Sequence, residues 1–374
     1  MNDSPVLALA RDLIARKSLT PDDAGCCAVI GERLAKLGFR LEYLNSEGVT
    51  NLWATRGSGA PLVIFAGHTD VVPPGPLDQW HSNPFSPTTR DGVLYGRGAA
   101  DMKSGLSAMV CAVEKLPREH RGTIAFLVTS DEEGYARHGT KHVVQTLKAR
   151  GMKPDYAIVG EATGEHALGD RIMIGRRGSL GCNLKILGKQ GHVAYPSKAD
   201  NPIHRVTPAL AELIATRWDE GNEHFPPTSF QISNFHSGTG ANNVIPGEAD
   251  VIFNFRYCTA STADGLKQRV HAILDRHALR YEADWWHTGE PFLTQPGKLI
   301  DATKAAIAEI TRLTPTQFTG GGTSDARFLA PWGAEVVELG PINDSIHKVN
   351  EHVRVEDLDR LSAIYLGIAR RLLS

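Results

Sequence analysis

Residues 62–70 read LVIFAGHTD, an apolar run of strand length that ends abruptly at His68. Three further apolar runs of this length follow, at residues 123–129, 156–159 and 335–339. Helical periodicity separates the runs, notably over residues 102–116 and 142–150. Strands that are apolar on both faces and alternate with helices predict an α/β fold, a mainly parallel twisted sheet flanked by helices. Ligands of such sheets bind at the carboxyl ends of the strands.

The middle of the chain has a different order of elements. Its predicted strands and helices follow one another as strand 180–187, helix 202–218, strand 229–235, strand 249–257, helix 263–277 and strand 280–286. This is the β-α-β-β-α-β order of a ferredoxin-like unit. Because 374 residues exceed what one core usually organises, we expect two domains. Residues 1–177 and 291–374 would form the first, and residues 178–290 an inserted second domain.

Composition and charge exclude several classes of protein. The chain is 41% hydrophobic and 22% charged, which is typical of globular proteins and unlike fibres or disordered scaffolds. Its 40 Lys and Arg residues nearly balance its 42 Asp and Glu residues. A chain with this balance has no excess of positive charge with which to bind a nucleic acid or an anionic membrane. We therefore expect a small-molecule partner.

The cysteines and the N-terminal segment bear on the cellular compartment. The 5 cysteines are odd in number and show no CxxC spacing, so the sequence predicts neither a disulfide framework nor a thiolate zinc site. No basic stretch followed by an apolar core opens the sequence, and no apolar run approaches the length of a membrane span. These observations favour a cytoplasmic protein.

Polar residues with metal-binding side chains come directly after predicted strands or in short polar motifs. They are His68 and Asp70 in GHTD, Asp101 in GRGAADMKSG, Glu132 and Glu133 in TSDEEG, Glu161 in VGEA, and His347 in SIHKVNE. Imidazoles and carboxylates suit zinc or its divalent neighbours. Each residue alone would usually be a solvated or structural side chain. Several carboxylates at buried strand ends, however, need a cation to offset their repulsion and desolvation.

Four of these residues could have separate roles. Glu132 and Glu133 are adjacent and point in different directions, so one can bind a metal while the other acts as a base. Asp101 has two carboxylate oxygens and could bridge two metals. Asp70 could accept a hydrogen bond from His68 and fix the tautomer of that imidazole. Its alternative role is that of a helix cap or turn former.

The motifs GHTDVVP, GRGAADMKSG, DEEG and VGEAT resemble those of the dizinc aminoacylase and carboxypeptidase superfamily. Further motifs along the chain resemble those of the members that act on N-succinyl-LL-2,6-diaminopimelate. These motifs are RRGSLG, GKQGHVAYP, NPIH, FPPTSFQISN, GTGANNVIPGEADVIFNFRY, GGGTSDARF and EVVELGPINDSIHKVNE. The resemblance implies a zinc-dependent amidohydrolase that releases succinate and LL-2,6-diaminopimelate, in diaminopimelate and lysine biosynthesis.

The resemblance also implies roles for individual residues. His68 and Glu161 would hold one zinc, Glu133 and His347 the other, with Asp101 bridging both and Glu132 as general base. Each subunit would hold two Zn²⁺ ions, for which Co²⁺ or Mn²⁺ could substitute. A cis peptide bond is implied between Asp101 and Met102.

Further implied features concern the inserted domain. It would form the interface of a homodimer and act as a lid, and His192 would reach into the partner's site to stabilise the oxyanion. A substrate with three carboxylates needs cations and amide donors around it. By resemblance the substrate-binding residues are Arg176, Ser179, Tyr195, Asn242, Asn243, Arg256, Gly322 and Thr323. From the residues alone, Arg256 could equally form an ion pair on a strand, and the asparagines or the GGGTSD segment a turn.

Two rival interpretations remain. A related acylase, such as an acetylornithine deacetylase or a dipeptidase, would share the metal site, and the motifs around Arg176 and Arg256 argue against it. A non-catalytic metal-binding protein would keep the ligands without the chemistry. Glu132 disfavours this second rival, because a structural or storage site has no need for a base beside the metals.

Overall fold

The computed structural model describes residues 3–374 and separates into two compact units. The main unit contains the residues up to Gly175, Leu293–Phe318 and Ser324–Ser374. The inserted unit contains Arg176–Phe292 and Thr319–Thr323. The borders at 175 and 293 lie within about two residues of those expected from the sequence, whereas the short glycine-rich segment 319–323 is an addition that the sequence did not suggest.

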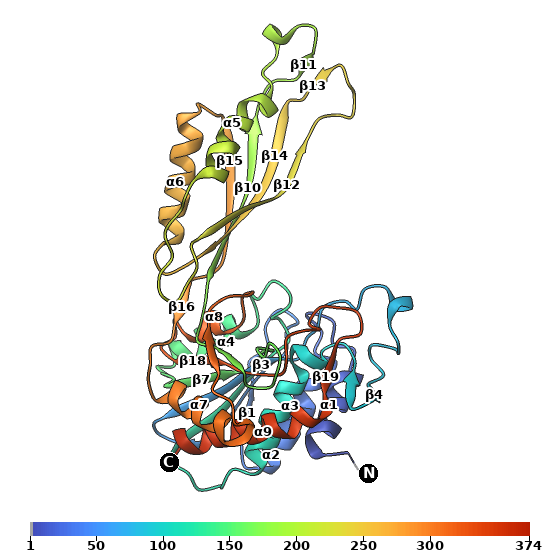
Figure 1. Cartoon of the computed structure of the whole chain (residues 1–374), viewed down its shortest axis with the longest axis vertical. Helices are drawn as coiled ribbons and strands as arrows, with labels where there is room; N and C mark the ends of the chain where they lie inside the picture. The colour runs from blue at the N-terminus through green and yellow to red at the C-terminus, as the bar shows by residue number, and fades with distance from the viewer. Residues whose placement is uncertain (1–2) are drawn as a thin grey trace. The chain divides into compact units, whose positions relative to one another are not determined.

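An eight-stranded sheet forms the centre of the main unit (Figure 1). In spatial order its strands are β1 (Arg40–Tyr43), β2 (Asn51–Ser58), β6 (Gly122–Thr129), β3 (Leu62–His68), β7 (Tyr156–Val159), β18 (Glu335–Glu338), β8 (Arg171–Met173) and β17 (Thr316–Phe318). The central strands β6, β3, β7 and β18 are mutually parallel. The predicted α/β fold with a mainly parallel sheet is therefore confirmed.

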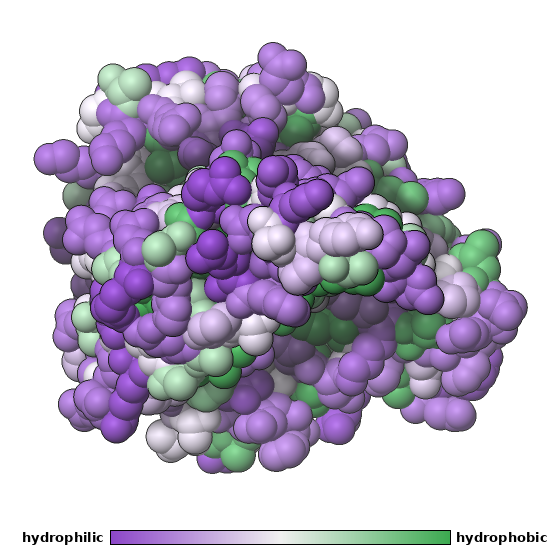
Figure 2. All heavy atoms as spheres, turned by 90° about the horizontal axis from the view of Figure 1, so that it is seen from above, coloured by the Kyte–Doolittle hydropathy of each residue, from purple (hydrophilic) through white to green (hydrophobic). Residues whose placement is uncertain are grey.

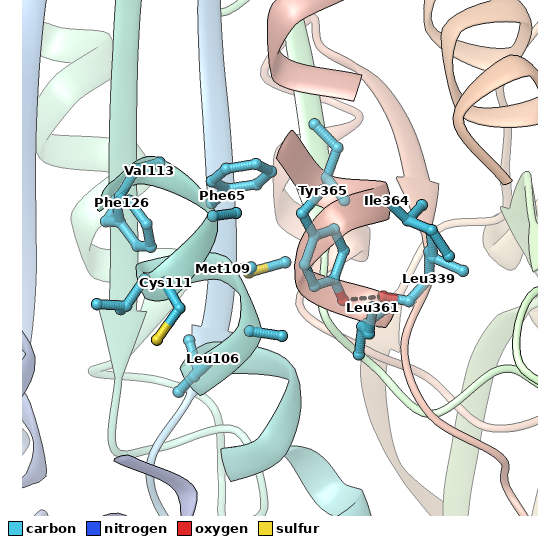
Figure 3. Close-up of a cluster of buried hydrophobic side chains, with 14 of the residues drawn as sticks. Phe65, Leu106, Met109, Cys111, Val113, Phe126, Leu339, Leu361, Ile364 and Tyr365 are labelled. Carbon is cyan, nitrogen blue, oxygen red and sulfur yellow. Dashed lines mark hydrogen bonds between the residues drawn. The ribbon is translucent and has the colours of Figure 1, made fainter. Parts of the chain in front are cut away.

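Helices flank this sheet and complete the hydrophobic core. They are α1 (Pro5–Ala15), α2 (Cys26–Lys36), α3 (Ser104–Glu114), α4 (Thr140–Ala149), α7 (Lys298–Thr311), α8 (Ala326–Leu329) and α9 (Val355–Leu372). Helix α3 packs against β3, α1 and α9, and α9 packs against α7. The rings of Phe126 and Tyr365 contact Phe65 of β3 with centroids 5.6 and 5.7 Å away, and the Tyr365 hydroxyl donates to the carbonyl oxygen of Leu339 (Figure 3).

Smaller elements complete the main unit. Strands β19 (His352–Arg354), β5 (Val93–Tyr95) and β4 (Thr88–Arg90) form a three-stranded antiparallel sheet. The turn η1 (Leu77–Gln79) precedes it in the chain, and the wide helical turn η2 (Ala99–Lys103) leads into α3. The short strands β9 (Gly175–Arg176) and β16 (Phe292–Leu293) lie where the chain passes between the two units.

The inserted unit has the predicted ferredoxin-like order of elements. Its elements are β10 (Gly178–Leu187), α5 (Pro202–Ala215), β12 (Ser229–Ser237), β14 (Glu248–Tyr257), α6 (Ala263–Arg276) and β15 (Tyr281–Gly289). The strands form an antiparallel sheet in the order β12, β14, β10, β15. Alternate residues of β14 are buried and share one hydrophobic core with α5 and α6. Beyond this sheet, β11 (Gly191–His192) and β13 (Val244–Ile245) pair with each other, and η3 (Pro196–Lys198) follows β11.

Exposed apolar side chains are scattered along the chain, and the cysteines are buried. Hydrophilic residues dominate the face seen in Figure 2, and apolar residues occur there in small groups. Strongly exposed apolar side chains such as Leu77 of η1, Tyr135 of the loop after β6 and Ile214 of α5 lie far apart in the chain. Within residues 3–374, no helix is both long and apolar enough to span a membrane. All 5 cysteines are buried, and each is free.

Candidate metal centre

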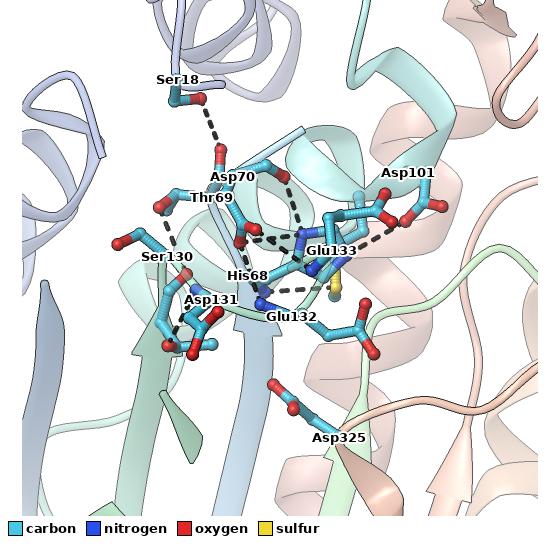
Figure 4. Close-up of polar contacts among 12 residues, drawn as sticks. Ser18, His68, Thr69, Asp70, Asp101, Ser130, Asp131, Glu132, Glu133 and Asp325 are labelled. Atoms are coloured by element: carbon cyan, nitrogen blue, oxygen red, sulfur yellow. Dashed lines mark hydrogen bonds and ion pairs between the residues drawn. The ribbon is translucent and has the colours of Figure 1, made fainter. Parts of the chain in front are cut away.

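The candidate metal ligands of the main unit gather at the carboxyl ends of its parallel strands (Figure 4). His68 is the last residue of β3 and pairs in register with Thr129, the last residue of β6. Glu132 and Glu133 lie in the loop that follows β6, and Glu161 follows β7. Because these parallel strands end at one edge of the sheet, side chains far apart in the sequence converge there.

Hydrogen bonding fixes the orientation of His68. Its Nδ1 donates to the backbone carbonyl oxygen of Asp70 at 2.9 Å, which leaves the lone pair of Nε2 available in the neutral imidazole. Nε2 lies 3.1 Å from Oδ1 of Asp101 and 3.8 Å from Oε1 of Glu161. A lone pair that faces two carboxylate oxygens requires a positive charge between them. Either a proton on His68 or a cation can supply that charge.

Asp101 lies between two imidazoles. Its Oδ1 faces Nε2 of His68, and its Oδ2 lies 3.3 Å from Nε2 of His347. The same nitrogen of His347 lies 2.9 Å from Oε1 of Glu133. Ligand atoms of a tetrahedral zinc with bonds of about 2.0 to 2.1 Å are about 3.3 Å apart, which is close to these spacings. The peptide bond between Asp101 and Met102 is cis, as the resemblance implied.

The electrostatics of this cluster favour a cation. Hydrogen bonds to Asp101 and Glu133 raise the pKa of His347 to about 10. Burial works to raise the pKa of Asp101, but its contacts with His347 and His68 outweigh burial and hold that pKa below its ordinary value. The carboxylates thus stabilise positive charge at both imidazoles. Two sets of three donor atoms lie within 4.8 Å of one another: those of His68, Asp101 and Glu133, and those of His68, Glu132 and Glu161. Nitrogen and oxygen donors in this arrangement fit zinc or a similar divalent ion.

Asp70 positions the two adjacent glutamates. Its carboxylate oxygens accept hydrogen bonds from the backbone N–H groups of Glu132 at 3.3 Å and Glu133 at 3.1 Å. The hydrogen bond from His68 goes to the backbone carbonyl of Asp70, while the carboxylate lies 3.6 Å from the same nitrogen. The sequence suggested the carboxylate as the acceptor. In the structure that group instead fixes the turn that carries Glu132 and Glu133.

Glu132 lies beside the cluster in a largely buried position. Its side chain is 10% exposed, and its Oε1 lies 3.4 Å from Nη2 of Arg327. Burial, with a smaller contribution from the nearby charge of Asp325, raises the pKa of Glu132 well above its usual value. Burial also raises the pKa of Asp325 to about 6. A carboxylate with a raised pKa is better suited to accept and release a proton near neutral pH.

Asp325 and Arg327 are neighbours of Glu132 to which no role was assigned from the sequence. Both belong to the motif GGGTSDARF, in which only the glycine and threonine positions received a role. Thr140 at the start of α4 donates to Oδ2 of Asp325 at 2.7 Å, which anchors this segment. The pattern of small residues followed by an acid and a base was the signal that could have drawn attention to them.

The other predicted site residues lie in the inserted unit, in two groups. The first is at the end of the sheet where β10 begins: Ser179 pairs with Arg256 of β14, and Nη1 of Arg176 donates to the carbonyl oxygen of Gly320 at 3.0 Å. Gly322 and Thr323 belong to that same short segment 319–323. We call this set the basal group. Its arginines could bind carboxylates.

The second group, which we call the tip group, lies at the other end of the same sheet. The rings of His192 and Tyr195 have centroids 5.7 Å apart, and Val193 N–H donates to the carbonyl oxygen of Asn243 at 3.1 Å. Asn242 precedes Asn243 in the same exposed loop. From Ser179 to Leu187, β10 alone extends for about 26 Å at ~3.3 Å per residue. The basal and tip groups of one chain are therefore too far apart to contact the same small substrate.

The fold and the metal centre together define a metal-dependent hydrolase, with its metal ligands at the carboxyl edge of a mainly parallel sheet. The model of peptidase family M20/M25/M40 matches residues 64–371, and the chain belongs to this family.

Full-length relatives and solved structures agree with this assignment. A protein of Thioalkalivibrio sulfidiphilus named succinyl-diaminopimelate desuccinylase is 59% identical over 373 residues, covering 99% of each chain. An M20 family metallo-carboxypeptidase from Sulfolobus solfataricus has the same fold, with a TM-score of 0.84 at 17% identity and 99% of each chain covered. A dinuclear metal-binding M20 peptidase from Bacillus subtilis aligns with a TM-score of 0.73 at 16% identity, covering 98% of this chain and 97% of its own.

Proposed function

We propose that the protein hydrolyses N-succinyl-LL-2,6-diaminopimelate to succinate and LL-2,6-diaminopimelate, a step of diaminopimelate and lysine biosynthesis. The observation that carries the hydrolytic part is Asp101 between two imidazoles, with the buried carboxylate of Glu132 beside them. The full-length relative at 59% identity supports the choice of substrate. The 5 buried, unpaired cysteines support a location in the reducing cytoplasm.

The proposed cofactor is a pair of Zn²⁺ ions, with Co²⁺ or Mn²⁺ as possible substitutes. His68 and Glu161 would hold one ion, Glu133 and His347 would hold the other, and Asp101 would be the ligand shared by both. Bound zinc lowers the pKa of water toward ~7 and polarises a carbonyl group. The spacings of 3.1 to 3.8 Å between His68, Asp101, Glu161 and His347 support this assignment.

Glu132 acts as the general base and then as the general acid. It takes a proton from the attacking water and delivers it to the amine that leaves when the succinyl amide bond breaks. Arg327 lies against Oε1 of Glu132 and restrains the rotation of its carboxylate. The hydrogen bonds that Asp70 accepts keep the backbone of Glu132 in place during this cycle.

The basal group supplies the cations and polar groups that bind the substrate carboxylates. Arg176, Ser179, Arg256, Gly322 and Thr323 take this role here, with guanidinium groups suited to bidentate binding. Tyr195, Asn242 and Asn243 of the tip group complete the set. The tip group of the same chain cannot reach a substrate held by the basal group, which supports its delivery from a partner.

A homodimer formed through the inserted unit meets this requirement, with the unit serving as interface and lid. In such an assembly the partner's tip group brings His192 to the reacting carbonyl, where its imidazole stabilises the oxyanion. Isologous contact between two copies of one unit is the commonest route to a closed dimer.

Release of succinate from N-succinyl-LL-diaminopimelate tests the proposed function directly. We expect turnover by the purified protein to fall to background after chelation and to return when Zn²⁺ is added back, because the nucleophile depends on bound metal. N-acetylornithine serves as the parallel substrate and should be hydrolysed poorly. Activity on N-acetylornithine alone would show that the protein is an acetylornithine deacetylase instead. Metal binding without activity on either substrate, or on dipeptides, would favour a non-catalytic metal protein.

Substitution of Arg256 tests the assignment of the basal group. Arg256→Ala should lower kcat/KM for the succinyl substrate by roughly 10- to 100-fold, since it removes a charged hydrogen-bond donor to a carboxylate. Steady-state kinetics should show a much smaller effect on the residual hydrolysis of N-acetylornithine. Arg205→Ala, which removes an exposed arginine of α5 paired with Asp200, is the matched control and should leave both reactions unchanged. Equal losses on both substrates would contradict a role in substrate discrimination.

A further inference from the structure

A buried glutamate far from Asp101 in the sequence binds the backbone that carries it. Glu351 is fully buried. Its Oε1 accepts hydrogen bonds from the backbone N–H groups of Ala100 at 2.8 Å and Asp101 at 2.9 Å. Its Oε2 accepts from the backbone N–H of Gly98 at 2.9 Å and from Nη1 of Arg97 at 2.7 Å. One side chain thus holds the whole segment from Arg97 to Asp101.

The chemistry of this contact requires an ionised carboxylate. Four donors converge on two oxygens, which matches the lone pairs of a carboxylate that acts only as an acceptor. A glutamine has nearly the same shape, but its amide group would face two N–H donors in either orientation. Hydrogen bonds to a charged group are stronger than those between neutral groups, and a buried donor left without a partner destabilises the fold.

Arg97 is itself held in place on the side away from Glu351. Its Nη2 donates to the carbonyl oxygen of Pro73 at 3.3 Å, and its guanidinium carbon lies 5.3 Å from the ring centroid of Trp80. The side chain of Arg97 is 2% exposed. The ion pair between Arg97 and Glu351 therefore belongs to a rigid and dry part of the main unit.

The same contact joins the segments that carry two of the metal ligands. Glu351 follows His347 by four residues, and the N–H of Gly96 donates to the backbone carbonyl of Glu351 at 2.9 Å. Segment 96–101 is thus bound to segment 347–351 through both the backbone and the side chain of Glu351. Asp101 and His347, whose Oδ2 and Nε2 lie 3.3 Å apart, project from these two segments. Glu351 thus couples the backbone positions of the two ligands, through its hydrogen bond to the N–H of Asp101 and its place four residues after His347.

We propose that Glu351 is a positioning residue for the bridging ligand Asp101, and that its ionised carboxylate is required for two metal ions to bind together. It holds the backbone of Asp101 so that one carboxylate oxygen faces His68 and the other faces His347. This inference rests on the proposed two-metal centre. Without Glu351, the metal position between Asp101, Glu133 and His347 loses its geometry first, because His68 and Glu161 are fixed independently by the ends of β3 and β7.

Titration of the metal-free full-length chain with Co²⁺ tests the proposal, with calorimetry and the visible absorption of bound Co²⁺ as readouts. Wild-type protein should bind two ions, and Glu351→Gln should keep the first while the second binds about 10- to 100-fold more weakly. Its spectrum should then be that of a single bound ion. Asp357→Asn is the matched control, because it removes another buried carboxylate of the main unit, one paired with Arg360. This control should bind two ions like the wild type.

Each result of the titration decides the question. Folded Glu351→Gln protein that binds two ions with wild-type affinities would overturn the inference. If that variant does not fold, Arg97→Lys replaces it, because lysine keeps the charge but loses the contact geometry of the guanidinium. A weaker second ion in Arg97→Lys supports the proposal, and unchanged binding refutes it. A wild-type chain that binds only one ion would refute the two-metal centre itself, and with it this inference.

Discussion

Glu132→Gln should retain both metal ions and lower kcat by about 10²- to 10⁴-fold. Glutamine matches glutamate in shape but cannot accept the proton of the attacking water or return it to the leaving amine. The turn that carries residue 132 should be preserved, because Asp70 holds it through backbone N–H groups that the substitution leaves intact. The measurement combines the steady-state rate of succinate release with the metal content of the purified variant.

Glu133→Gln is the matched control for this prediction. The two residues are adjacent, and both bind Asp70 through their N–H groups, but the side chain of Glu133 faces His347 at 2.9 Å. Its substitution should reduce metal content as well as rate. Turnover close to that of the wild type in Glu132→Gln would remove Glu132 from its role as base. Loss of metal from Glu132→Gln would make it a ligand instead, as one of the two sets of donor atoms allows.

His192→Ala should lower kcat by roughly 10²- to 10³-fold, the usual effect of removing one group that stabilises an oxyanion. Its metal content should not change, because His192 lies in the inserted unit and the metal ligands lie in the main unit. The more informative experiment combines this variant with Glu132→Gln in one dimer. Two affinity tags on co-expressed chains allow the mixed dimer to be purified.

In the mixed dimer, the chain with His192→Ala keeps Glu132, and its partner keeps His192. If the imidazole acts across the interface, one of the two sites is complete, and about half of the wild-type rate should return. If His192 acts on the site of its own chain, neither site is complete and the mixed dimer stays inactive. Dimers that carry the same substitution in both chains provide the baseline. An inactive mixed dimer would therefore refute the transfer of His192 between subunits.

Much of the fold follows from patterns in the sequence. The strands β3, β6, β7 and β18 were predicted because apolar runs mark strands that are buried on both faces. The ferredoxin-like order was predicted from the alternation that keeps one face of β14 buried. The edge strands β1 and β17 were missed, because both are short and carry no apolar run; no residue of β1 is fully buried, and all three of β17 are exposed.

The candidate site shows where sequence patterns stop being informative. Its predicted ligands could be named because strand ends in parallel sheets share an edge, and the structure brings His68, Asp101, Glu133, Glu161 and His347 together there. Glu351 and Arg97 had no such signal. Their importance comes from hydrogen bonds between residues about 250 positions apart, which no local pattern encodes. Asp325 and Arg327, by contrast, lie in the motif GGGTSDARF, where only Gly322 and Thr323 had been assigned a role.

The position of β18 has a consequence for synthesis on the ribosome. This strand comes from residues 335–338, near the end of the chain, yet it lies in the middle of the sheet between β7 and β8. After β7 is made, the ribosome must add about 180 further residues, on the order of 10 s of translation, before its neighbour exists. The edge of β7 that pairs with β18 therefore has no partner from β18 while the inserted unit is being produced, and an unpaired strand edge is prone to aggregation during that interval.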